Sequence, residues 1–369
     1  MTKPIRALVL TPDFPPIPGG IQLLVHRLVS NMSGVRTRIV ALGAPGADEF
    51  DAHSALDVVR VARKGSRFNR LGVARLNAAG MRHGLTFRPG ILVSGHAVTA
   101  PASAALSAWR RIPVIQYLHG DEYRHRPRLV RFAVHRADAV IAVSRHAGDL
   151  AIAAGCEPDK LHVVHPGVDP PSQPLNGRAE RPTVVTVSRM FASYKGHDLM
   201  IQALPRIKQR VPEVEWVVIG DGPLRPGLEA MASSAGISDS VRFLGRIPDK
   251  QRDEWLGRAH VFALPSRLPD EGVGGEGFGI VYLEAGAHEL PVVGVAEGGA
   301  LDAVIDGETG RLVGPKDHIA LADAVADLLV NPEQAARLGE AGARRARQLS
   351  WKRHAQLVER LANDLTTRD

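Results

Sequence analysis

Short runs of hydrophobic, mostly β-branched residues recur along the chain, separated by longer amphipathic stretches. Such runs are typical of strands buried on both faces of a parallel sheet, and the stretches between them predict crossover helices. In the first half, the runs predict strands at residues 6–10, 39–42, 91–94, 113–118 and 139–143. In the second half, they predict strands at residues 183–187, 214–219, 241–244, 260–264 and 291–295.

A segment rich in proline and glycine separates the two sets of predicted strands. Residues 166–174 read Pro-Gly-Val-Asp-Pro-Pro-Ser-Gln-Pro, which is typical of a linker. We therefore expect an α/β fold of two doubly wound domains, residues 1–180 and 181–351. A helical pattern begins at Pro332-Glu333. Because ligands of such domains bind at the carboxyl ends of strands, the loops that follow strands are the places to look for function.

The composition is that of an ordinary globular protein. The 369 residues are 44% hydrophobic and 23% charged, with 37 Gly and 26 Pro, which excludes a disordered, fibrous or coiled-coil chain. Cys156 is the single cysteine, so an internal disulfide or a multi-thiolate metal site is excluded. The apolar run at residues 5–10 is too short for a signal peptide, and no run approaches the ~18 apolar residues of a membrane span. We expect a cytoplasmic protein.

Charge is distributed unevenly between the halves. Residues 1–180 hold 23 Lys/Arg against 13 Asp/Glu, a balance of +10, whereas residues 181–369 hold 23 against 26, a balance of −3. The basic residues concentrate at residues 60–82 and 124–136, and in the second segment they alternate with apolar ones. That pattern suits a helix lying on an anionic membrane, and a solvated basic face is the alternative. Nucleic-acid binding is disfavoured, because aromatic residues are only 5% of the chain and no recognition motif is present.

Paired glycines follow the first predicted strand. Gly19 and Gly20 directly precede the amphipathic run 21–29, and free amides at a helix N-terminus favour a bound phosphate. A Gly-Gly turn that only reverses the chain is the alternative. The loop lacks the Gly-x-Gly-x-x-Gly fingerprint, which argues against a dinucleotide-dependent dehydrogenase.

Two cations follow the first predicted strand of the second half. Arg189 and Lys195 flank one loop, and a guanidinium fork together with an ammonium group would suit a diphosphate. Solvated surface cations are the alternative.

Two glutamates frame a helix that we expect to begin near Gly279. Glu276 lies beside its first-turn amides, whereas Glu284 lies within an apolar helical stretch. A carboxylate there requires a partner, either a cation or the hydroxyls of a polyol. The alternative is purely structural, with Glu276 complementing the helix dipole and Glu284 in an ion pair.

Together these motifs resemble a known family. They are Arg189 and Lys195, Gly-Asp-Gly-Pro at residues 220–223, the two glutamates with seven residues between them, and Gly-Glu-Thr-Gly-Arg-Leu-Val at residues 307–313. In this combination the chain resembles the family 4 retaining glycosyltransferases of the GT-B fold over nearly its whole length. The loop at residues 13–22 looks most like that of bacterial mannosyltransferases that build phosphatidylinositol mannosides. The resemblance implies two facing Rossmann-like domains with a cleft between them, and we expect the final helix, about residues 352–369, to pack on the first domain.

The resemblance also implies roles in the second domain, which would bind the nucleotide-sugar donor. Arg189 and Lys195 resemble the cations on the diphosphate, Glu284 the carboxylate on the ribose, and Glu276 the carboxylate at the donor sugar. The donor-binding backbone would be that of Gly277, Phe278, Gly279 and Ile280.

Further roles are implied for the acceptor domain and for the base. Gly19 and Gly20 resemble the loop that closes on the diphosphate, and His119 resembles an active-site histidine that follows a strand, although it would otherwise read as an ordinary loop residue. Ile247, with Asp249 and Arg252, matches the region where relatives contact the base. Asp249 could accept a hydrogen bond from guanine or cap the helix that follows it.

The sequence contains no Asp-x-Asp triplet. We therefore expect no metal and no cofactor, with the two cations and the helix dipoles neutralising the departing diphosphate. The expected donor is GDP-mannose, with UDP-glucose and UDP-N-acetylglucosamine as alternatives. The acceptor would be a lipid-linked, saccharide or polyol hydroxyl, and a lipid-linked one would bring the protein to the inner face of the membrane. Alternatives of other classes are a nucleotide-sugar 2-epimerase and a non-catalytic nucleotide-sugar or lipid-surface binding protein.

Overall fold

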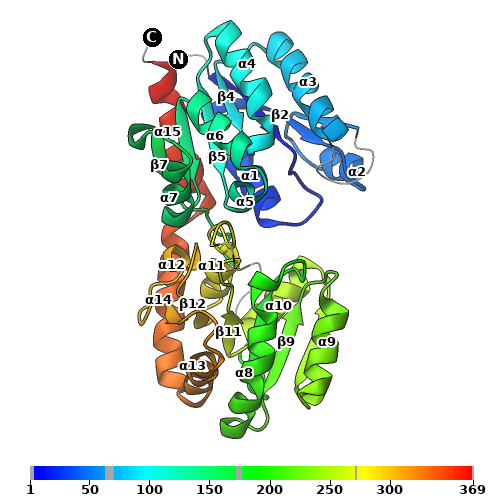
Figure 1. Ribbon diagram of the computed structural model, residues 1–369, viewed down its shortest axis with the longest axis vertical. Helices are drawn as coiled ribbons and strands as arrows, with labels where there is room; N and C mark the ends of the chain where they lie inside the picture. Colours follow the sequence, from blue (N-terminus) through cyan, green and yellow to red (C-terminus); the bar gives the residue numbers. More distant parts are fainter. Residues whose placement is uncertain (1–3, 63–69, 172–176, 271, 368–369) are drawn as a thin grey trace. The chain divides into compact units, whose positions relative to one another are not determined.

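The computed structural model describes residues 4–62, 70–171, 177–270 and 272–367, which divide into two compact units (Figure 1). Unit 1 comprises Met1–Gly167 together with Trp351–Asp369, and unit 2 comprises Val168–Ser350.

The first chain crossing, at Gly167, therefore falls before the expected boundary at residue 180. Local hydrogen bonds explain the difference. The Val168 N–H donates to the Leu349 carbonyl at 2.9 Å, and the Arg178 and Arg181 guanidinium groups donate to backbone carbonyls of unit 2.

Unit 1 is built on a seven-stranded parallel sheet in the order β3-β2-β1-β4-β5-β6-β7. Its strands are β1 Ile5–Thr11, β2 Val35–Leu42, β3 Val58–Val61, β4 Ile91–Ser94, β5 Val114–Leu118, β6 Ala139–Ala142 and β7 Leu161–Val163. Its helices are α1 Gly20–Asn31, α2 Ala47–Ala52, α3 Arg70–Phe87, α4 Ala100–Arg110, α5 Asp121–His125, α6 Pro127–Arg136, α7 Arg145–Ala153 and α15 Trp351–Thr366.

Unit 2 is built on a six-stranded parallel sheet in the order β10-β9-β8-β11-β12-β13. Its strands are β8 Thr183–Val187, β9 Glu215–Ile219, β10 Val241–Gly245, β11 Val261–Leu264, β12 Val292–Val295 and β13 Gly310–Val313. Its helices are α8 His197–Arg210, α9 Arg225–Ser234, α10 Asp249–Arg258, α11 Ile280–Ala287, α12 Ala300–Ala303, α13 His318–Val330 and α14 Pro332–Gln348.

The prediction of two doubly wound parallel sheets is confirmed, since each predicted run coincides with a strand. The hydrophobic pattern did not predict β3, β7 and β13, which are all edge strands of their sheets. The predicted helix start at Pro332 is also confirmed, because the Asn331 side chain accepts a hydrogen bond from the Gln334 N–H at the start of α14.

The strand orders position the candidate loops. The order reverses between β1 and β4 in unit 1 and between β8 and β11 in unit 2. At such a switch point the loops that leave neighbouring strands diverge, which opens a ligand-binding crevice at the carboxyl ends. The loops after β8 and β11 carry Lys195 and Glu276. Because these two strands are neighbours in the sheet, the topology brings the distant residues together at the carboxyl ends of the strands.

The last helix, α15, packs against α1 within unit 1. The Gly34 N–H, just before β2, donates to the Glu359 carboxylate of α15 at 2.9 Å. The C-terminal segment thus completes the fold of the N-terminal unit. The last two residues of the predicted helix, 368–369, lie outside the described residues.

Candidate functional site

The centre of the candidate site in unit 2 is an ion pair between two loops. Lys195 Nζ lies 2.5 Å from Glu276 Oε2, and the two side chains are 17% and 18% exposed. His197, two residues after Lys195, begins α8; burial and the charge of Lys195 lower its pKa to about 4. His197 is therefore neutral near pH 7, and Lys195 provides the positive charge at this position.

The helix after Glu276 begins where the sequence predicts. Gly279 is the N-cap of α11, with φ of 89°, a left-handed conformation that glycine adopts without a Cβ penalty. Ile280 is the first helical residue, so amides of the first turn are available to a ligand. The Tyr282 hydroxyl donates to the Leu264 carbonyl at 2.6 Å, which fixes α11 to the end of β11.

A second glycine fixes the loop before α11. The Gly299 N–H donates to the Glu276 carbonyl at 2.9 Å. A Cβ at Gly299 would lie 2.4 Å from the carbonyl carbon of Gly277 and from Cα of Phe278. The backbone of the loop after β12 therefore lies directly against the predicted donor-binding segment.

Glu284 has the cationic partner that the sequence analysis required. Its Oε1 lies 3.8 Å from an Arg252 nitrogen, and the side chain is 14% exposed. Burial raises the pKa of the Glu284 carboxyl, and the Arg252 guanidinium opposes this shift. Arg252 also contacts Asp249 at 3.1 Å and Asp253 at 3.4 Å. The cluster keeps Glu284 close to a positive charge within an apolar helix.

Asp249 and Ile247 lie at the start of α10. Asp249 is the first helical residue and Pro248 is the N-cap, so of the two alternatives for Asp249 the capping role is wrong. The Asp249 carboxylate instead accepts from Arg252, one turn later. Ile247 is half-buried just before the helix.

Arg189 lies in an exposed position after β8. Its guanidinium carbon is 5.9 Å from the centre of the Phe191 ring, and Phe191 is itself 64% exposed. Unit 2 thus brings together Lys195, Glu276, the start of α11 and Glu284, and it presents Arg189 on the same loop as Lys195.

In unit 1, Gly19 is the N-cap of α1 and Gly20 its first residue. The preceding loop is fixed by a hydrogen bond from Gln22 Nε2 to Asp13 Oδ1 at 2.9 Å. The amides at this helix start follow the carboxyl end of β1, as the sequence predicts.

His119 directly follows β5 and is buried, with 7% of its surface exposed. Its Nε2 lies 2.8 Å from the Gly95 carbonyl, in the loop after β4. The carboxylate of Glu122 accepts hydrogen bonds from the His119 and Gly120 amides, at 2.5 and 3.1 Å. Glu122 was not predicted as a support for this loop, because no Ser or Thr at the start of α5 marks a capping box there.

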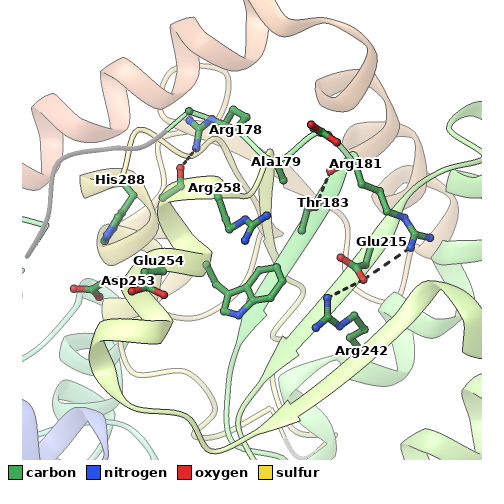
Figure 2. Close-up of a pocket in the computed structure, with 14 residues that line it drawn as sticks. Arg178, Ala179, Arg181, Thr183, Glu215, Arg242, Asp253, Glu254, Arg258 and His288 are labelled. Carbon is green, nitrogen blue, oxygen red and sulfur yellow. Dashed lines mark hydrogen bonds and ion pairs between the residues drawn. The ribbon is translucent and has the colours of Figure 1, made fainter.

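A charged pocket of about 730 Å³ lies elsewhere in unit 2 (Figure 2). It is lined by Thr183, Glu215 and Arg242, which lie at the amino ends of β8, β9 and β10. In Figure 2, Glu215 points toward Arg181 and Arg242, with which it forms ion pairs of 3.9 and 3.3 Å. This pocket lies toward the amino ends of the strands, whereas Lys195 and Glu276 lie in loops that follow the carboxyl ends.

Metal-binding clusters and membrane-spanning helices are both absent from the part of the chain that the structure describes. Within residues 4–62, 70–171, 177–270 and 272–367, no group of three or more His, Cys, Asp or Glu side chains is placed to hold a metal ion. None of the helices in these ranges is both long enough and apolar enough to cross a membrane.

Two family models match consecutive parts of the chain. Residues 18–171 match the model described as Glycosyltransferase Family 4, and residues 171–345 match the model described as Glycosyl transferases group 1. A GDP-mannose-dependent alpha-(1-6)-phosphatidylinositol monomannoside mannosyltransferase of Mycolicibacterium smegmatis is 34% identical over 96% of this chain and 98% of that protein. The chain belongs to glycosyltransferase family 4.

A second curated relative matches less of the chain. A D-inositol 3-phosphate glycosyltransferase of Streptomyces coelicolor is 32% identical over 59% of this chain and 53% of that protein. Among solved structures, Anabaena HepE in complex with UDP-glucose has a TM-score of 0.80 and 21% identity, covering 98% of this chain and 100% of that one. The sucrose-phosphate synthase of Thermosynechococcus elongatus also has a TM-score of 0.80, at 20% identity over the whole of both chains.

These likenesses give the family 4 protein the GT-B class of fold, with two Rossmann-like units, as the resemblance implied. The protein is a glycosyltransferase. The 2-epimerase alternative has no support among these relatives, and the family assignment replaces the alternative of a non-catalytic binding protein.

Proposed function

We propose that this glycosyltransferase transfers a mannosyl group from GDP-mannose to a hydroxyl of a phosphatidylinositol-linked acceptor. The donor and acceptor are those named for the Mycolicibacterium relative, which is similar over nearly its full length, whereas the inositol 3-phosphate enzymes match over little more than half. The observation that carries the proposal is that Lys195, Glu276 and the start of α11 meet at the carboxyl ends of the unit 2 strands.

Unit 2 would bind the donor through charged side chains at the carboxyl ends of its strands. Arg189 and Lys195 would bind the diphosphate, with the first-turn amides of α11 contributing their dipole. The Glu284 carboxylate would accept the two ribose hydroxyls, and Glu276, released from Lys195, would accept hydroxyls of the sugar. The base would lie against Ile247. The backbone of this donor-binding segment is that of Gly277, Phe278, Gly279 and Ile280.

Unit 1 would supply the remaining groups. The amides of Gly19 and Gly20 would contact the diphosphate, and His119 would contact the sugar. Because a carbonyl only accepts hydrogen bonds, the bond to Gly95 places a proton on His119 Nε2, and in the neutral ring Nδ1 then has a lone pair. That nitrogen would accept a hydrogen bond from a sugar hydroxyl.

The reaction would proceed with retention of configuration at the anomeric carbon. The acceptor hydroxyl attacks on the face from which the diphosphate departs, the bond from the anomeric carbon to the phosphate oxygen breaks, and a β-phosphate oxygen takes the hydroxyl proton. Arg189 and Lys195 stabilise the negative charge that develops on the leaving diphosphate, so protein cations act where a divalent ion would otherwise be needed.

Thermal unfolding with GDP, UDP, ADP and their sugars, in the presence and absence of EDTA, tests this proposal, because a ligand that binds the native state raises its stability. GDP-mannose should raise Tm with EDTA present, and the enzyme should then transfer mannose to phosphatidylinositol or its monomannoside in EDTA. A response to uridine nucleotides only would overturn the choice of GDP-mannose. Transfer that is lost in EDTA and restored by Mg²⁺ or Mn²⁺ would overturn the metal-free mechanism.

A lipid-linked acceptor implies contact with a membrane surface, and α6 has residues that could make this contact. Its apolar residues Val130, Ala133 and Val134 are buried, so the helix exposes its basic face. That face includes Arg128 and Arg131, which would attract anionic lipid headgroups.

Exposed aromatic side chains are present on α6 itself and on α4, which packs against it. Phe132 on α6 is 37% exposed, and Trp109 on the adjacent α4 is 62% exposed. Flotation with anionic and neutral vesicles tests the idea. The double variant R128Q/R131Q should recover less protein with anionic vesicles, whereas R337Q/R344Q on α14 should behave as wild type. Equal recovery of wild type from both kinds of vesicle would overturn the membrane proposal.

A further inference from the structure

The ring of His119 stacks on the ring of Tyr117, a residue of β5. Tyr117 and His119 are two residues apart at the end of β5, so their side chains lie on the same side of the sheet. Their ring centroids are 6.1 Å apart with an interplanar angle of 18°, a stacked arrangement. The orientation of the Tyr117 ring therefore limits the orientation of the His119 ring.

Tyr117 is in turn held by the C-terminal helix. It is fully buried, and its hydroxyl lies 3.1 Å from Nε2 of His354 on α15. His354 Nδ1 lies 2.9 Å from the His165 carbonyl, which can only accept, so Nδ1 carries the proton. In a neutral ring, Nε2 then has a lone pair, and the Tyr117 hydroxyl donates to it.

Burial keeps His354 in this neutral form, because it lowers the pKa of the imidazole to about 4. The edge of Trp351 packs against the same ring, with centroids 5.8 Å apart and an interplanar angle of 77°. His354 thus has a defined tautomer and a fixed ring plane, as a group that orients another side chain requires.

This chain of contacts begins at the two places where the polypeptide passes between the units. His165 lies two residues before the first crossing at Gly167, and His354 three residues after the return at Trp351. Both segments contribute to the same set of contacts, in which hydrogen bonds join His165, His354 and Tyr117, and ring stacking joins Tyr117 to His119.

We propose that Tyr117 and His354 are positioning residues for His119. Their hydrogen bond fixes the Tyr117 ring, and the stacked ring keeps His119 with Nε2 on the Gly95 carbonyl and Nδ1 available to the donor sugar. This inference rests on the proposed function, in which His119 contacts that sugar. It adds that the position of α15, through His354, determines how His119 meets its substrate.

The variant Y117F tests the link, because it removes the hydroxyl and keeps the ring. It should lower kcat about tenfold, as expected for a slightly misplaced contact group, and leave the KM for the donor within about twofold, because nucleotide affinity is set mainly by unit 2. H354L should have a similar effect. The double variant should be no slower than the slower single variant, since both substitutions break one connection.

Y123F is the matched control. The Tyr123 hydroxyl also donates to a buried acceptor in unit 1, the Ala147 carbonyl at 2.8 Å. Y123F should lower Tm about as much as Y117F and retain the wild-type kcat. If both variants lose kcat equally, the effect is one of general stability and the positioning role is overturned.

A second measurement does not depend on turnover. The imidazole nitrogen resonances of His119, assigned with H119Q, should show a single Nε2–H tautomer in the wild type and a mixture in Y117F. Unchanged His119 resonances in Y117F would overturn the inference even in an active enzyme. If the wild type transfers no sugar from any donor, the proposed function fails, and altered resonances in Y117F would still support the link to His354.

Discussion

At the scale of single residues, the candidate site in unit 2 contains charged groups whose burial lowers the stability of the native state. Glu284 lies within an apolar helix, and its nearest cation, Arg252, is shared with Asp249 and Asp253. Its pKa is raised, so the native state favours the protonated carboxyl more than the unfolded chain does. Native stability associated with this group therefore falls as pH rises above the unfolded value of 4.5 toward the folded one.

The variant E284Q separates stability from binding. It removes a buried charge and leaves Arg252 with its two aspartates, so Tm near pH 7 should be at least that of wild type, and the decline in stability as pH rises above about 4.5 should be smaller. Donor KM should rise about 10- to 100-fold, the loss expected for hydrogen bonds to a charged group. Thermal unfolding across pH and steady-state kinetics provide the measurements.

E229Q on the exposed face of α9 is the control, since Glu229 forms an i,i+4 ion pair with Arg225. It should leave the donor KM unchanged. An E284Q enzyme with wild-type donor KM would show that Glu284 is a structural ion-pair partner, the alternative that the sequence left open.

Residue type and spacing were sufficient to predict that Lys195 and Glu276 lie in loops that follow strands and that Glu284 lies within a helix beginning near Gly279. The same approach could not identify the Tyr117–His354 contact. These residues are 237 positions apart, and each reads locally as an ordinary core residue of a strand or an amphipathic helix. Their juxtaposition depends on α15 returning to unit 1, which no local pattern encodes.

At the scale of elements, edge and central strands differ in how visible they are in the sequence. Central strands such as β4 and β8 are almost entirely buried and therefore read as apolar runs. β3 and β7 are only partly buried, and their sequences Val-Val-Arg-Val and Leu-His-Val carry polar residues. An edge strand with one solvated side lacks the continuous hydrophobic signal on which the prediction relied.

The loop after β12 packs closely against the loop before α11, and the variant G299A tests the importance of this contact. Gly299 has no room for a Cβ against the backbone of Gly277 and Phe278, and backbone atoms cannot move aside as a flexible side chain can. We expect G299A to displace the segment that leads into α11, raise donor KM about tenfold or more, and lower Tm, as overpacking typically costs about 1–3 kcal/mol. Kinetics and thermal unfolding measure both effects.

G227A provides the matched glycine control. A Cβ at Gly227 meets no atom within 4 Å in the described part of the chain, and the residue lies inside α9. Alanine should stabilise the helix by about 0.5–1 kcal/mol and leave the donor KM unchanged. If G299A also behaved in this way, the loop after β12 would have no part in shaping the donor site.

At the scale of the whole molecule, each unit has its own hydrophobic core. One is centred on Leu8, Leu10 and Leu92, and the other on Val184, Trp216 and Val293. The polypeptide passes between them only at Gly167–Val168 and Ser350–Trp351. With separate cores, a ligand that binds one unit stabilises mainly that unit against local opening.

GDP should therefore change amide hydrogen exchange unevenly along the chain. At about 100 times its Kd it stabilises the native state by about 2.7 kcal/mol, and we expect the slowed amides to lie in unit 2, at residues 189–196 and 276–287. Peptides from β2, β3 and α3 in unit 1 should exchange at their unliganded rates. E284Q should need a higher GDP concentration for the same protection, whereas E229Q should not. Protection that is greatest in unit 1, or that is unaffected by E284Q, would contradict the assignment of the nucleotide to the site formed by Lys195, Glu276 and Glu284.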